Sequence, residues 1–508
     1  MMVAPREQSG MMLSELLTDI AELPLSADRE VSGLAIDSRL VTQGSLFLAC
    51  SGFARHGLEF LQQALSGGAV AVVCEPDSEW DAARIDRLAC DIPVPLVQVE
   101  GLGRRVSLLA GRFYGHPTEN LPLVGITGTN GKTSCSQFLA QALAPEQRCA
   151  VIGTLGNGFL GMLKQGIHTT PDPVELQSAL AGMRDEGADL VAMEVSSHAL
   201  DQGRAEDLRF DIAVLTNLSR DHLDYHGTME SYEAAKRRLF FMPGLNCAVL
   251  NMDDAFGRTL AAELPAGVRC IGYAFTQSAV AGLDEWIHVT DLHSSDSGMS
   301  VVLRSSWGDG ELTTSLLGRF NVSNLLAVLA VLLEQGVALD EALHRLSGVE
   351  TVSGRMEHFG GGELPLVVVD FAHTPDALEH AITALRPHTA GTLSVVFGCG
   401  GDRDRGKRSE MGAVAGRLAD RIWLTDDNPR SENGEGIIDE ILDGMPAHSM
   451  MIIERDRGRA ISDAIARSAP GDLVLVAGKG HEAYQQVGDL KLPFSDREQV
   501  RKALEVGR

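Results

Sequence analysis

The stretch LPLVGITGTNGKTSCSQFLAQAL, residues 121–143, decides the fold of this chain. Its first six residues are apolar enough to form a short buried strand, and glycines at positions 125, 128 and 131 mark a turn after it. Lys132 and Thr133 begin a helix in which apolar residues recur at helical spacing: Cys135, Phe138, Leu139, Ala142 and Leu143. A strand, a glycine-rich turn and a helix in this order predict an α/β fold built around a phosphate-binding loop.

Such a loop binds nucleotide phosphates. Glycines let backbone N–H groups point inward, and the helix dipole favours negative charge. Lys132 would reach the outer phosphates, and the Thr133 hydroxyl could hold Mg2+. The spacing departs from the common GxxxxGK[ST] pattern, because position 126 is Ile and the first glycine lies one residue earlier. A tight turn with an exposed lysine is the alternative, but the strand, the glycines, the Lys-Thr pair and the helix all favour phosphate binding.

The bulk composition describes a large acidic chain. Its 508 residues suffice for about three domains, and 44% hydrophobic residues support substantial cores. The formal net charge of -26 argues against a broad nucleic-acid or anionic-membrane surface. We therefore expect no nucleic-acid partner, and a polyanionic substrate would have to meet local basic pockets.

Cysteine usage and hydropathy favour the cytoplasm. Eight cysteines are scattered without a CxxC pair or metal-ligand spacing, which suits thiols in a reducing compartment. The longest apolar run, residues 325–333, is too short to span a bilayer. The N-terminus shows no basic region followed by an apolar core. We expect a cytoplasmic protein without membrane insertion.

The first hundred or so residues form a unit of their own. We expect helices over residues 13–23 and 60–65, and strands in VSGLAIDSR, GSLFLAC, AVAVVCE and VPLVQVE. The breaker-rich segment GHPTEN, residues 115–120, is the expected linker, which places the first domain at 1–118. Taken alone, Ser38 and Arg55 fit ordinary surface residues.

The central segment alternates strand and helix, as a parallel sheet requires. We expect buried strands at residues 151–154, 190–195, 212–215 and 248–251. Glu194 ends one strand and could bind Mg2+ beside Thr133, since ligands bind at the carboxyl edge of open α/β sheets. The loop TNLSRDHLDYHG, residues 216–227, collects two Asp and two His after another strand, which suits metal or phosphate chemistry. A polar loop with capping roles is its alternative interpretation.

Residues 271–317 change to alternating strands, which predicts an antiparallel edge on a central domain of residues 119–349. The segment GRFNVSN then places Asn321 and Asn324 ahead of a strongly apolar helix, where either could be only a helix cap.

A third domain, residues 350–508, has four strand-like runs: LPLVVVDF, TLSVVFGCGG, RIWLTDD and DLVLVAGKG. Each ends in a polar or glycine-rich loop, and these loops carry Asp370 and His373, Asp402 and Arg403, residues 427–430, and residues 479–482. The GCGGDR loop is not a dinucleotide fingerprint, because Arg403 stands where that pattern needs its third glycine.

The whole set of motifs resembles the Mur ligase family, the ATP-dependent amide ligases that build the peptidoglycan stem peptide. The resemblance covers nearly the full chain and rests on motifs in a fixed order: GITGTNGKTS, TTPDP, EVSSHAL, TNLSRDHLDYHG with EAAK, GRFNVSN, VSGRMEHF, DFAHTPDAL, GCGGDRDRGKR, DDNPR and AGKGHE. It implies a domain for the UDP sugar, a central ATPase domain and a Rossmann-like C-terminal domain. Among family members, the motifs are most similar to those that add meso-2,6-diaminopimelate to the D-glutamate of UDP-N-acetylmuramoyl-L-alanyl-D-glutamate.

The resemblance also implies roles for individual residues, and a monomer. ATP would contact Gly128, Thr129, Asn130, Gly131, Lys132, Thr133, Ser134, Asn321, Arg355, Asp370 and His373. The UDP-muramoyl dipeptide would contact Ile36, Ser38, Phe53, Ala54, Arg55, Thr169, Thr170, Ser196, Gln202 and Arg204. Diaminopimelate would contact Arg403, Asp427, Asn428, Pro429, Arg430, Gly478 and Glu482. Mg2+ would be held by Thr133 and Glu194, and by His222 with a carbamylated Lys236; the expected catalytic residues are Lys132, His222 and Lys236. His168 is a departure, because related ligases carry Asn before the threonine pair.

Other functions share parts of this pattern. A GTPase switch would have the phosphate loop, but an NKxD guanine-reading sequence is absent from the chain. A kinase would also use Lys132 and Mg2+, but it would have little use for two arginine-bearing loops at the far end. Within the family, the lysine-adding enzyme and folylpolyglutamate synthetase are the nearer alternatives. Taken without the resemblance, Lys236 fits a solvated helix face.

Overall fold

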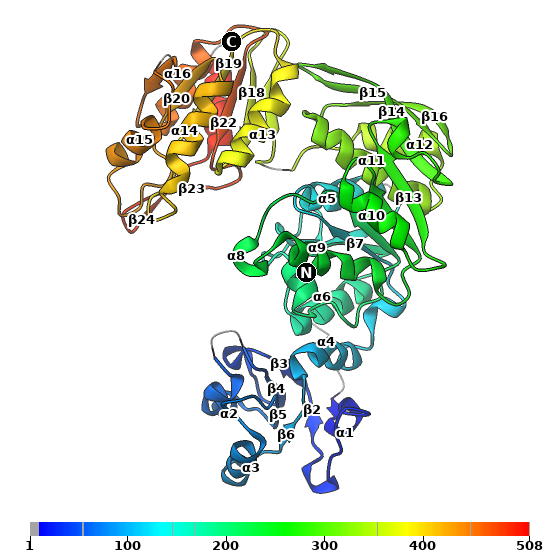
Figure 1. Cartoon of the computed structure of the whole chain (residues 1–508). Coiled ribbons are helices and arrows are strands. Elements are labelled where there is room, and N and C mark those ends of the chain that lie inside the picture. The colour runs from blue at the N-terminus through cyan, green and yellow to red at the C-terminus, as the bar shows by residue number, and fades with distance from the viewer. Residues whose placement is uncertain are drawn as a thin grey trace. The chain divides into compact units, whose positions relative to one another are not determined.

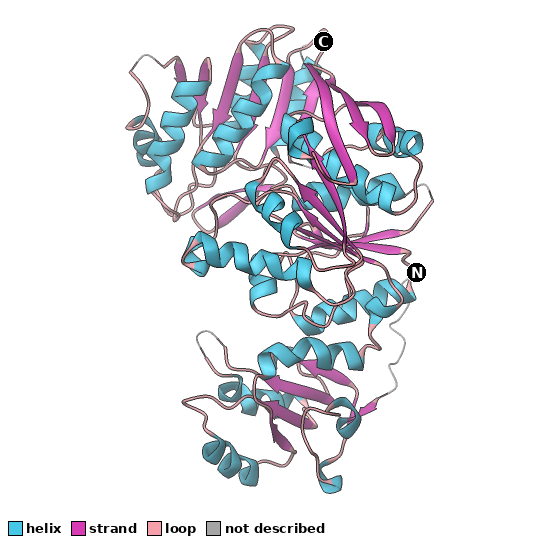
Figure 2. Ribbon diagram, turned by 45° about the vertical axis from the view of Figure 1, so that its right-hand side comes forward, coloured by secondary structure: helices cyan, strands magenta, loops and turns pink. Residues whose placement is uncertain are grey.

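The computed structural model describes residues 10–52, 55–144, 146–166, 168–352, 354–447 and 449–506. Helices and strands are mixed in both of its compact units, Met1–Gly272 and Tyr273–Arg508, as predicted for an α/β protein (Figures 1 and 2). The finer division into domains 1–118, 119–349 and 350–508 stays a prediction.

The first unit begins with a four-stranded parallel sheet in the order β3-β4-β5-β6. Alternate side chains of β4 enter two different cores, because successive residues of a strand face opposite sides. Leu46 and Leu48 pack with helix α4, whereas Phe47 and Ala49 pack with α2 and α3. The elements are β1 Met11–Met12, α1 Leu13–Leu16, β2 Glu30–Val31, β3 Gly33–Ala35, β4 Ser45–Ala49, α2 Leu61–Gly67, β5 Ala71–Cys74, α3 Ala82–Asp91, β6 Leu96–Gln98 and α4 Leu102–Phe113.

The helix expected over residues 13–23 is wrong beyond its first turn. Helix α1 ends at Leu16, and Asp19 adopts a left-handed φ of 61° that an α-helix cannot contain. Pro24 follows, so the apolar residues of this segment pack from turns instead.

A second, larger sheet follows, and the part of it within this unit has its strands in the order β12-β11-β7-β10-β8-β9. All of these neighbours are parallel except β8 and β9, as the alternation of strand and helix predicts. Its elements are β7 Leu123–Thr127, α5 Lys132–Leu143, β8 Cys149–Gly153, β9 Gly156–Phe159, α6 Pro173–Asp185, β10 Leu190–Glu194, α7 Ser197–Asp201, β11 Ile212–Leu215, α8 Leu223–His226, α9 Met229–Arg237, β12 Cys247–Asn251 and α10 Ala255–Glu263. Strand β7 is central, which places the phosphate loop between the ends of β10 and β11.

The second unit begins with the antiparallel strands expected from the sequence. Strands β14 Glu285–Ser295, β15 Gly298–Ser305 and β16 Gly308–Thr314 pair in succession after β13 Arg269–Ala274, which crosses the boundary between the units. Helices α11 Arg319–Glu334 and α12 Leu339–Ser347 follow. The expectation that Asn321 or Asn324 caps α11 is wrong, because the helix begins before them and Gly318 is its N-cap.

The remainder of the second unit is a six-stranded sheet in the order β17-β18-β22-β19-β20-β21, parallel except for β17. One face packs against α13, α14 and α15, and the other against α16 and α17. The elements are β17 Glu357–Gly360, β18 Leu366–Asp370, α13 Pro375–Leu385, β19 Leu393–Phe397, α14 Gly406–Leu418, β20 Arg421–Leu424, α15 Gly434–Leu442, β21 Met451–Ile453, α16 Arg457–Ala466, β22 Leu473–Ala477, the hairpin β23 Tyr484–Val487 and β24 Leu490–Pro493, and α17 Asp496–Val506. Helices on both faces of a parallel sheet agree with the expected Rossmann-like fold.

Candidate active site

The phosphate loop runs from the end of β7 to the start of α5, as predicted. Gly128 has a φ of 144°, and a Cβ there would lie 1.9 Å from Thr216 Oγ1, so only glycine fits. Gly131, with a φ of 87°, is the N-cap of α5. The loop is held by the segment after β11: Asn217 Oδ1 accepts from Asn130 N at 3.0 Å, and Thr216 Oγ1 donates to Asn130 O at 2.6 Å. The backbone of the loop is therefore fixed before any ligand arrives.

Two lysines converge on one carbonyl of this loop. Lys132 Nζ donates to Gly128 O at 2.6 Å, and Lys236 Nζ, from helix α9, donates to the same oxygen at 2.8 Å. Burial lowers the pKa of Lys132. Burial, with repulsion from Lys132, holds the pKa of Lys236 well below its usual range. Lys236 is 1% exposed, so the solvated-face alternative for this residue is wrong.

Glu194 ends β10 beside the loop. Its Oε2 accepts from Thr133 Oγ1 at 2.9 Å and from Thr154 Oγ1 at 3.1 Å, and its Oε1 accepts from Thr154 N at 2.9 Å. Burial raises the pKa of Glu194 against the attraction of Lys132. Hydroxyl and carboxylate oxygens are the donors that Mg2+ prefers, and that ion usually keeps several waters and takes phosphate oxygens as well. Thr133 and Glu194 therefore fit the predicted Mg2+, which stays a prediction.

His222 follows in the loop after β11 and has a left-handed φ of 53°. Its ring lies 5.0 Å from that of His198 and 6.0 Å from that of Tyr232, and the Lys236 Nζ lies 4.6 Å from the Tyr232 ring centroid. Tyr232 therefore contacts both members of the predicted second metal site. Within the described ranges, His, Cys, Asp and Glu form no group of three or more placed to hold a metal. The pairing of His222 with a modified Lys236 stays a prediction.

The residues predicted for the muramoyl dipeptide lie together beside Glu194. Thr170 Oγ1 donates to Glu194 O at 2.9 Å and accepts from Ser196 N at 3.1 Å. Arg204 donates to Thr170 O at 2.8 Å and to Gln202 Oε1, and burial lowers its pKa. Thr169 Oγ1 is 3.0 Å from Thr154 Oγ1, which joins this group to the Glu194 carboxylate. Their chemistry suits an anionic substrate near the phosphate loop. His168, which directly precedes Thr169, is exposed.

The described residues predicted for the uridine end follow strands of the N-terminal sheet: Ile36 and Ser38 come after β3, and Arg55 comes after β4. Ser38 is buried and donates to Gln63 Oε1 at 2.8 Å, so the surface alternative for Ser38 is wrong. Ile36 is half-buried, and the Arg55 guanidinium lies 5.9 Å from the Phe60 ring centroid. Phe53 and Ala54 lie outside the described residues.

Four residues of the second unit are predicted to contact ATP. Three of them lie around Phe371, whereas the fourth, Asn321, lies in helix α11. The Arg355 guanidinium is 5.0 Å from the Phe371 ring centroid, the His373 ring 4.5 Å, and Asp370 precedes Phe371 at the end of β18. Asp370 accepts from Met356 N at 2.8 Å, and burial raises its pKa. Asn321 lies inside α11 and donates to Leu317 O at 2.9 Å.

The residues predicted for diaminopimelate gather where β19, β20 and β22 end. Arg430 Nη1 donates to Gly401 O at 2.6 Å, and Gly401 N donates to Asn428 O at 2.9 Å, which joins the loop of Arg403 to the DNPR loop. Asn428 donates to Glu482 Oε2 at 2.9 Å. Asp427 is 9% exposed, and burial raises its pKa. Pro429 and Gly478 belong to the same edge of the sheet. Asn428, next to Pro429, accepts a hydrogen bond through its Oδ1 from Lys479, next to Gly478.

Three family models match this chain in succession along its length. They are the Mur ligase family catalytic domain at residues 30–105, the Mur ligase middle domain at residues 126–332 and the glutamate ligase domain of Mur ligases at residues 354–480. Together they cover most of the sequence. The chain belongs to the Mur ligase family.

Curated relatives of this Mur ligase match it nearly end to end. The UDP-N-acetylmuramoyl-L-alanyl-D-glutamate–2,6-diaminopimelate ligase of Alkalilimnicola ehrlichii is 49% identical over 97% of this chain and 99% of its own length. The enzyme of that name from Pseudomonas syringae pv. tomato is 50% identical over 96% and 98%.

Solved structures of Mur ligases also match this chain over nearly its full length. A ligase structure of the same name is 35% identical, with a TM-score of 0.75 over 98% of this chain and 99% of that one. The MurF ligase of Thermotoga maritima, in complex with ADP, shares the fold at 20% identity, with a TM-score of 0.59 over 93% and 97%. The predicted family and fold are confirmed.

Several residues of this Mur ligase site were missed by sequence reasoning. Thr154 binds Glu194, and Tyr232 donates to or accepts from Thr129 Oγ1 at 3.1 Å. His198 lies between His222 and His226, with ring centroids 5.0 and 5.4 Å away. Tyr232 precedes Lys236 by four residues, and that helical spacing was the available signal. Thr154 carries no local signal, because only the pairing of β8 with β10 brings it to Glu194.

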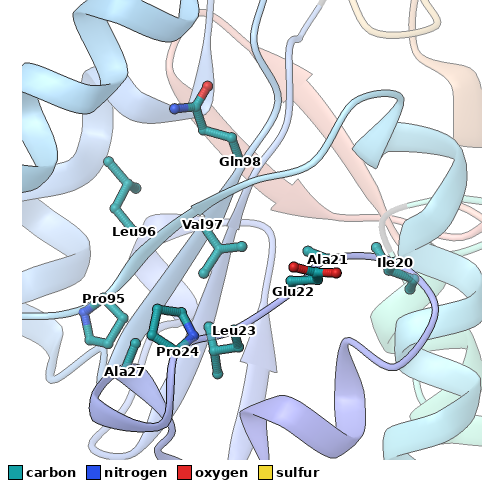
Figure 3. A pocket seen from close by; sticks show the side chains of 10 residues that line it. All are labelled: Ile20, Ala21, Glu22, Leu23, Pro24, Ala27, Pro95, Leu96, Val97 and Gln98. Carbon is teal, nitrogen blue, oxygen red and sulfur yellow. The ribbon is translucent and has the colours of Figure 1, made fainter.

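A cavity of about 480 Å³ lies apart from these residues, between residues 20–27 and strand β6 (Figure 3). Its lining is mostly apolar and consists of Ile20, Ala21, Glu22, Leu23, Pro24, Ala27, Pro95, Leu96, Val97 and Gln98. Separately, among the described helices none has both the length and the apolar character to cross a bilayer.

Proposed function

We propose that this chain is the ATP-dependent, ADP-forming ligase that joins meso-2,6-diaminopimelate to the D-glutamate of UDP-N-acetylmuramoyl-L-alanyl-D-glutamate, in peptidoglycan synthesis. The observation that carries the proposal is the identity of 49% to 50% over nearly the full length to ligases of that name. The phosphate loop and the arginine-bearing loops of the second unit supply the chemistry that this reaction needs.

The reaction has two steps. A carboxylate is a poor acyl donor, so an oxygen of the D-glutamate side-chain carboxylate attacks the γ-phosphorus of ATP, and ADP leaves with the electrons of the broken P–O bond. The product is an acyl phosphate. The amine of the amino acid then attacks the acyl carbon, and the tetrahedral intermediate loses a proton and expels phosphate to leave an amide.

The first-unit residues serve the phosphoryl step. Lys132 donates hydrogen bonds to the γ-phosphate once ATP displaces the Gly128 carbonyl as its partner, which offsets charge as it develops. Mg2+, held by Thr133 and Glu194, would supply further charge neutralisation. Thr170, Ser196 and Arg204 orient the muramoyl dipeptide beside the loop.

Lys236 is proposed to be carbamylated. Its amine is buried beside Lys132, and two unit charges about 4 Å apart repel by roughly 4 kcal/mol at an effective dielectric of 20. The lowered pKa of Lys236 favours the uncharged amine, the form that adds CO2. The carbamate is an anion, so it turns a repulsive group into one that can bind a metal with His222.

The second-unit residues select the amino acid. Arg430 and Arg403 lie in neighbouring loops. An arginine can bind a carboxylate through two parallel hydrogen bonds. Diaminopimelate differs from lysine by a carboxylate on the distal carbon. We assign that carboxylate to Arg430, with Arg403 as a second support.

The setting of the enzyme is part of the proposal. A cytoplasmic monomer fits scattered cysteines and nucleotide substrates. The domain roles follow the predicted boundaries: UDP sugar at 1–118, ATP at 119–349 and amino acid at 350–508.

Phosphate release tests the function directly. The enzyme is supplied with ATP, Mg2+ and the UDP-muramoyl dipeptide, and a panel of amino acids is added one at a time. We expect phosphate release only when dipeptide and diaminopimelate are both present, with a matching tripeptide product by mass spectrometry. Release without an amino acid would indicate a hydrolase or a kinase, and release with glutamate and a folate acceptor would indicate a folylpolyglutamate synthetase.

A further inference from the structure

Lys479 is a fully buried cation at the edge of the C-terminal sheet, and neither step of the proposed reaction uses it. It follows β22 between two glycines, Gly478 with a φ of 121° and Gly480 with a φ of 53°. A Cβ on Gly478 would lie 2.7 Å from Asp427 Oδ2, and one on Gly480 would lie 2.6 Å from Gly354 O. The Gly-Lys-Gly turn is therefore required by its surroundings, and it directs the lysine side chain inward, where it is 0% exposed.

The Lys479 ammonium joins two of the residues predicted to contact the amino acid. Its Nζ donates to Asn428 Oδ1 at 3.0 Å and to Glu482 Oε2 at 2.9 Å. Asn428 Nδ2 donates to the same Glu482 oxygen at 2.9 Å, and Gln486 N donates to Asn428 Oδ1 at 2.8 Å. Lys479, Asn428 and Glu482 thus form a closed triangle, the Lys479 triangle, in which the asparagine amide can take only one orientation.

The Lys479 triangle uses only one of the two oxygens of the Glu482 carboxylate. Glu482 Oε2 accepts both hydrogen bonds, whereas Oε1 accepts none from the described residues, and the side chain is 24% exposed. Partial burial alone would raise the pKa of Glu482, but the hydrogen bond and charge of Lys479 outweigh it and lower the pKa. Glu482 is therefore an ionised acceptor with one oxygen fixed and the other toward solvent.

The neighbouring buried cation cannot replace Lys479. Arg457 forms two hydrogen bonds of 2.7 Å to Asp496, and both side chains are 0% exposed. This pair neutralises itself, while Lys479 directs its charge to Glu482. Arg430 lies two residues after Asn428, and Asn428 donates to Glu482. A guanidinium that can bind a carboxylate and a carboxylate that can bind an ammonium therefore lie at the same edge of the sheet.

We infer that Lys479 is a positioning residue of the amino-acid site: it holds Asn428 and Glu482 so that Glu482 Oε1 meets the ammonium on the distal carbon of the substrate. The inference rests on the proposed function. A distal carbon that bears both a carboxylate and an ammonium needs both kinds of partner side by side, and the Lys479 triangle supplies the second kind. Lys479 itself does not touch the substrate.

The test compares two amino acids that differ only in that ammonium. Diaminopimelate and 2-aminopimelate have the same chain and both carboxylates, and the second lacks the distal amine. Hydrogen bonds to charged groups contribute about 1.5–3 kcal/mol, so wild-type kcat/KM should favour diaminopimelate by about 10- to 100-fold. In Lys479→Met this ratio should fall to within about 3-fold of unity, because diaminopimelate turnover falls while 2-aminopimelate turnover stays nearly unchanged. KM for ATP should not change.

Two further variants separate positioning from folding. Lys479→Gln keeps a polar side chain of similar length but no charge, and it should lose the ratio as Lys479→Met does. Ile461→Ala, in the buried face of α16, should lower Tm yet keep the wild-type ratio.

Two outcomes would count against the inference. A ratio that stays at the wild-type value in both Lys479 variants, whether activity is unchanged or falls equally with both amino acids, would overturn the inference and leave the ligase assignment intact, since a purely structural role would produce equal losses. A wild-type enzyme that turns over neither amino acid would remove the proposed function and the inference with it.

Discussion

At the scale of single residues, the site depends on two lysines that share one carbonyl oxygen. Lys132 and Lys236 both donate to Gly128 O, and burial lowers the pKa of each. A shared carbonyl is a poor partner for two full charges, so the arrangement is stable only if one amine is uncharged or modified, or if phosphates arrive to take up the charge. Each of these solutions gives a prediction.

Replacement of Lys132 tests its role in phosphoryl transfer. Lys132→Ala should lower kcat by about 10²-fold or more, the usual effect of losing a charge-stabilising donor. The exposed Lys164, changed to Ala, is the matched control and should leave kcat unchanged. Near-normal turnover of Lys132→Ala at saturating ATP would remove this role.

Replacement of Lys236 tests the carbamate. Lys236→Ala should be almost inactive and should regain part of its activity when formate or another small carboxylate is added, because the added anion can occupy the emptied position. Intact-protein mass should show the CO2 adduct on wild type and not on the variant. Full activity of Lys236→Ala without added carboxylate would contradict the proposal.

The sequence predicts these residues unevenly, for a physical reason. Lys132, Thr133 and Glu194 carry local signals, since a glycine-rich loop and a strand end restrict where they can lie. Lys236 carries none, and its amphipathic helix alone suggested a solvated position; only the long-range contact with Gly128 buries it. The sequence places Lys479 in a loop and indicates no role for it, because the Lys479 triangle depends on segments that the sequence does not relate.

At the scale of elements, strand-end loops of the C-terminal sheet are fixed to one another. Arg430 has a left-handed φ of 51°, and the hairpin holds its backbone: Arg430 N donates to Gln486 O at 3.1 Å and Gly488 N donates to Arg430 O at 2.7 Å. The side chain is therefore presented from a strained backbone, as functional residues often are.

Two replacements of Arg430 separate strain from charge. Arg430→Gly relieves the left-handed conformation and Arg430→Ala does not, but both remove the guanidinium. If the guanidinium binds the distal carboxylate, both should raise KM for diaminopimelate by about 10-fold or more, with KM for ATP near normal. A normal KM in Arg430→Gly alone would assign the effect to backbone strain.

The contact of Glu432, which lies in the loop of Arg430, with Arg408 predicts that the free energy of unfolding falls in acid. Arg408, fully buried in α14, donates to Glu432 and Glu440, and the hydrogen bond from Arg408 lowers the pKa of Glu432 from its ordinary 4.5 to about 2. A carboxyl whose pKa is lower in the folded state stabilises the fold above the unfolded value and loses that contribution as pH falls. Unfolding should therefore become easier between pH 4.5 and pH 2.

Thermal unfolding followed across that pH range measures the effect. Glu432→Gln should have a lower Tm at neutral pH and a weaker pH dependence below pH 4.5. Glu435→Gln, whose side chain is 72% exposed, is the control. Equal pH dependence in Glu432→Gln and wild type would show that the Arg408 contact does not stabilise the fold.

Elements were easier to predict than their ends. Strands β18, β19, β20 and β22 were expected because buried parallel strands are continuous apolar runs. Helix α1 and the start of α11 were misjudged: apolar residues at 13–23 pack from turns, and the two asparagines lie inside their helix. In both cases tertiary packing, which local periodicity does not contain, decides where the helix begins or ends.

At the scale of the whole molecule, the central claim is that this Mur ligase adds diaminopimelate in preference to lysine. The acidity of the chain supports a selective site, because a substrate with two carboxylates needs local positive charge to bind a protein of net charge -26. Lysine would leave Arg430 without its carboxylate, and a site built around a hydrogen-bonding group discriminates strongly against an analogue that lacks it.

One competition experiment measures this claim. Wild-type enzyme receives ATP, Mg2+, the UDP-muramoyl dipeptide and equal concentrations of meso-diaminopimelate and lysine, and the tripeptide products are quantified by mass spectrometry. We expect the diaminopimelate product in excess by about 10²-fold or more. Comparable amounts of the two products would contradict the specificity, and an excess of the lysine product would assign the enzyme to the other branch of the family.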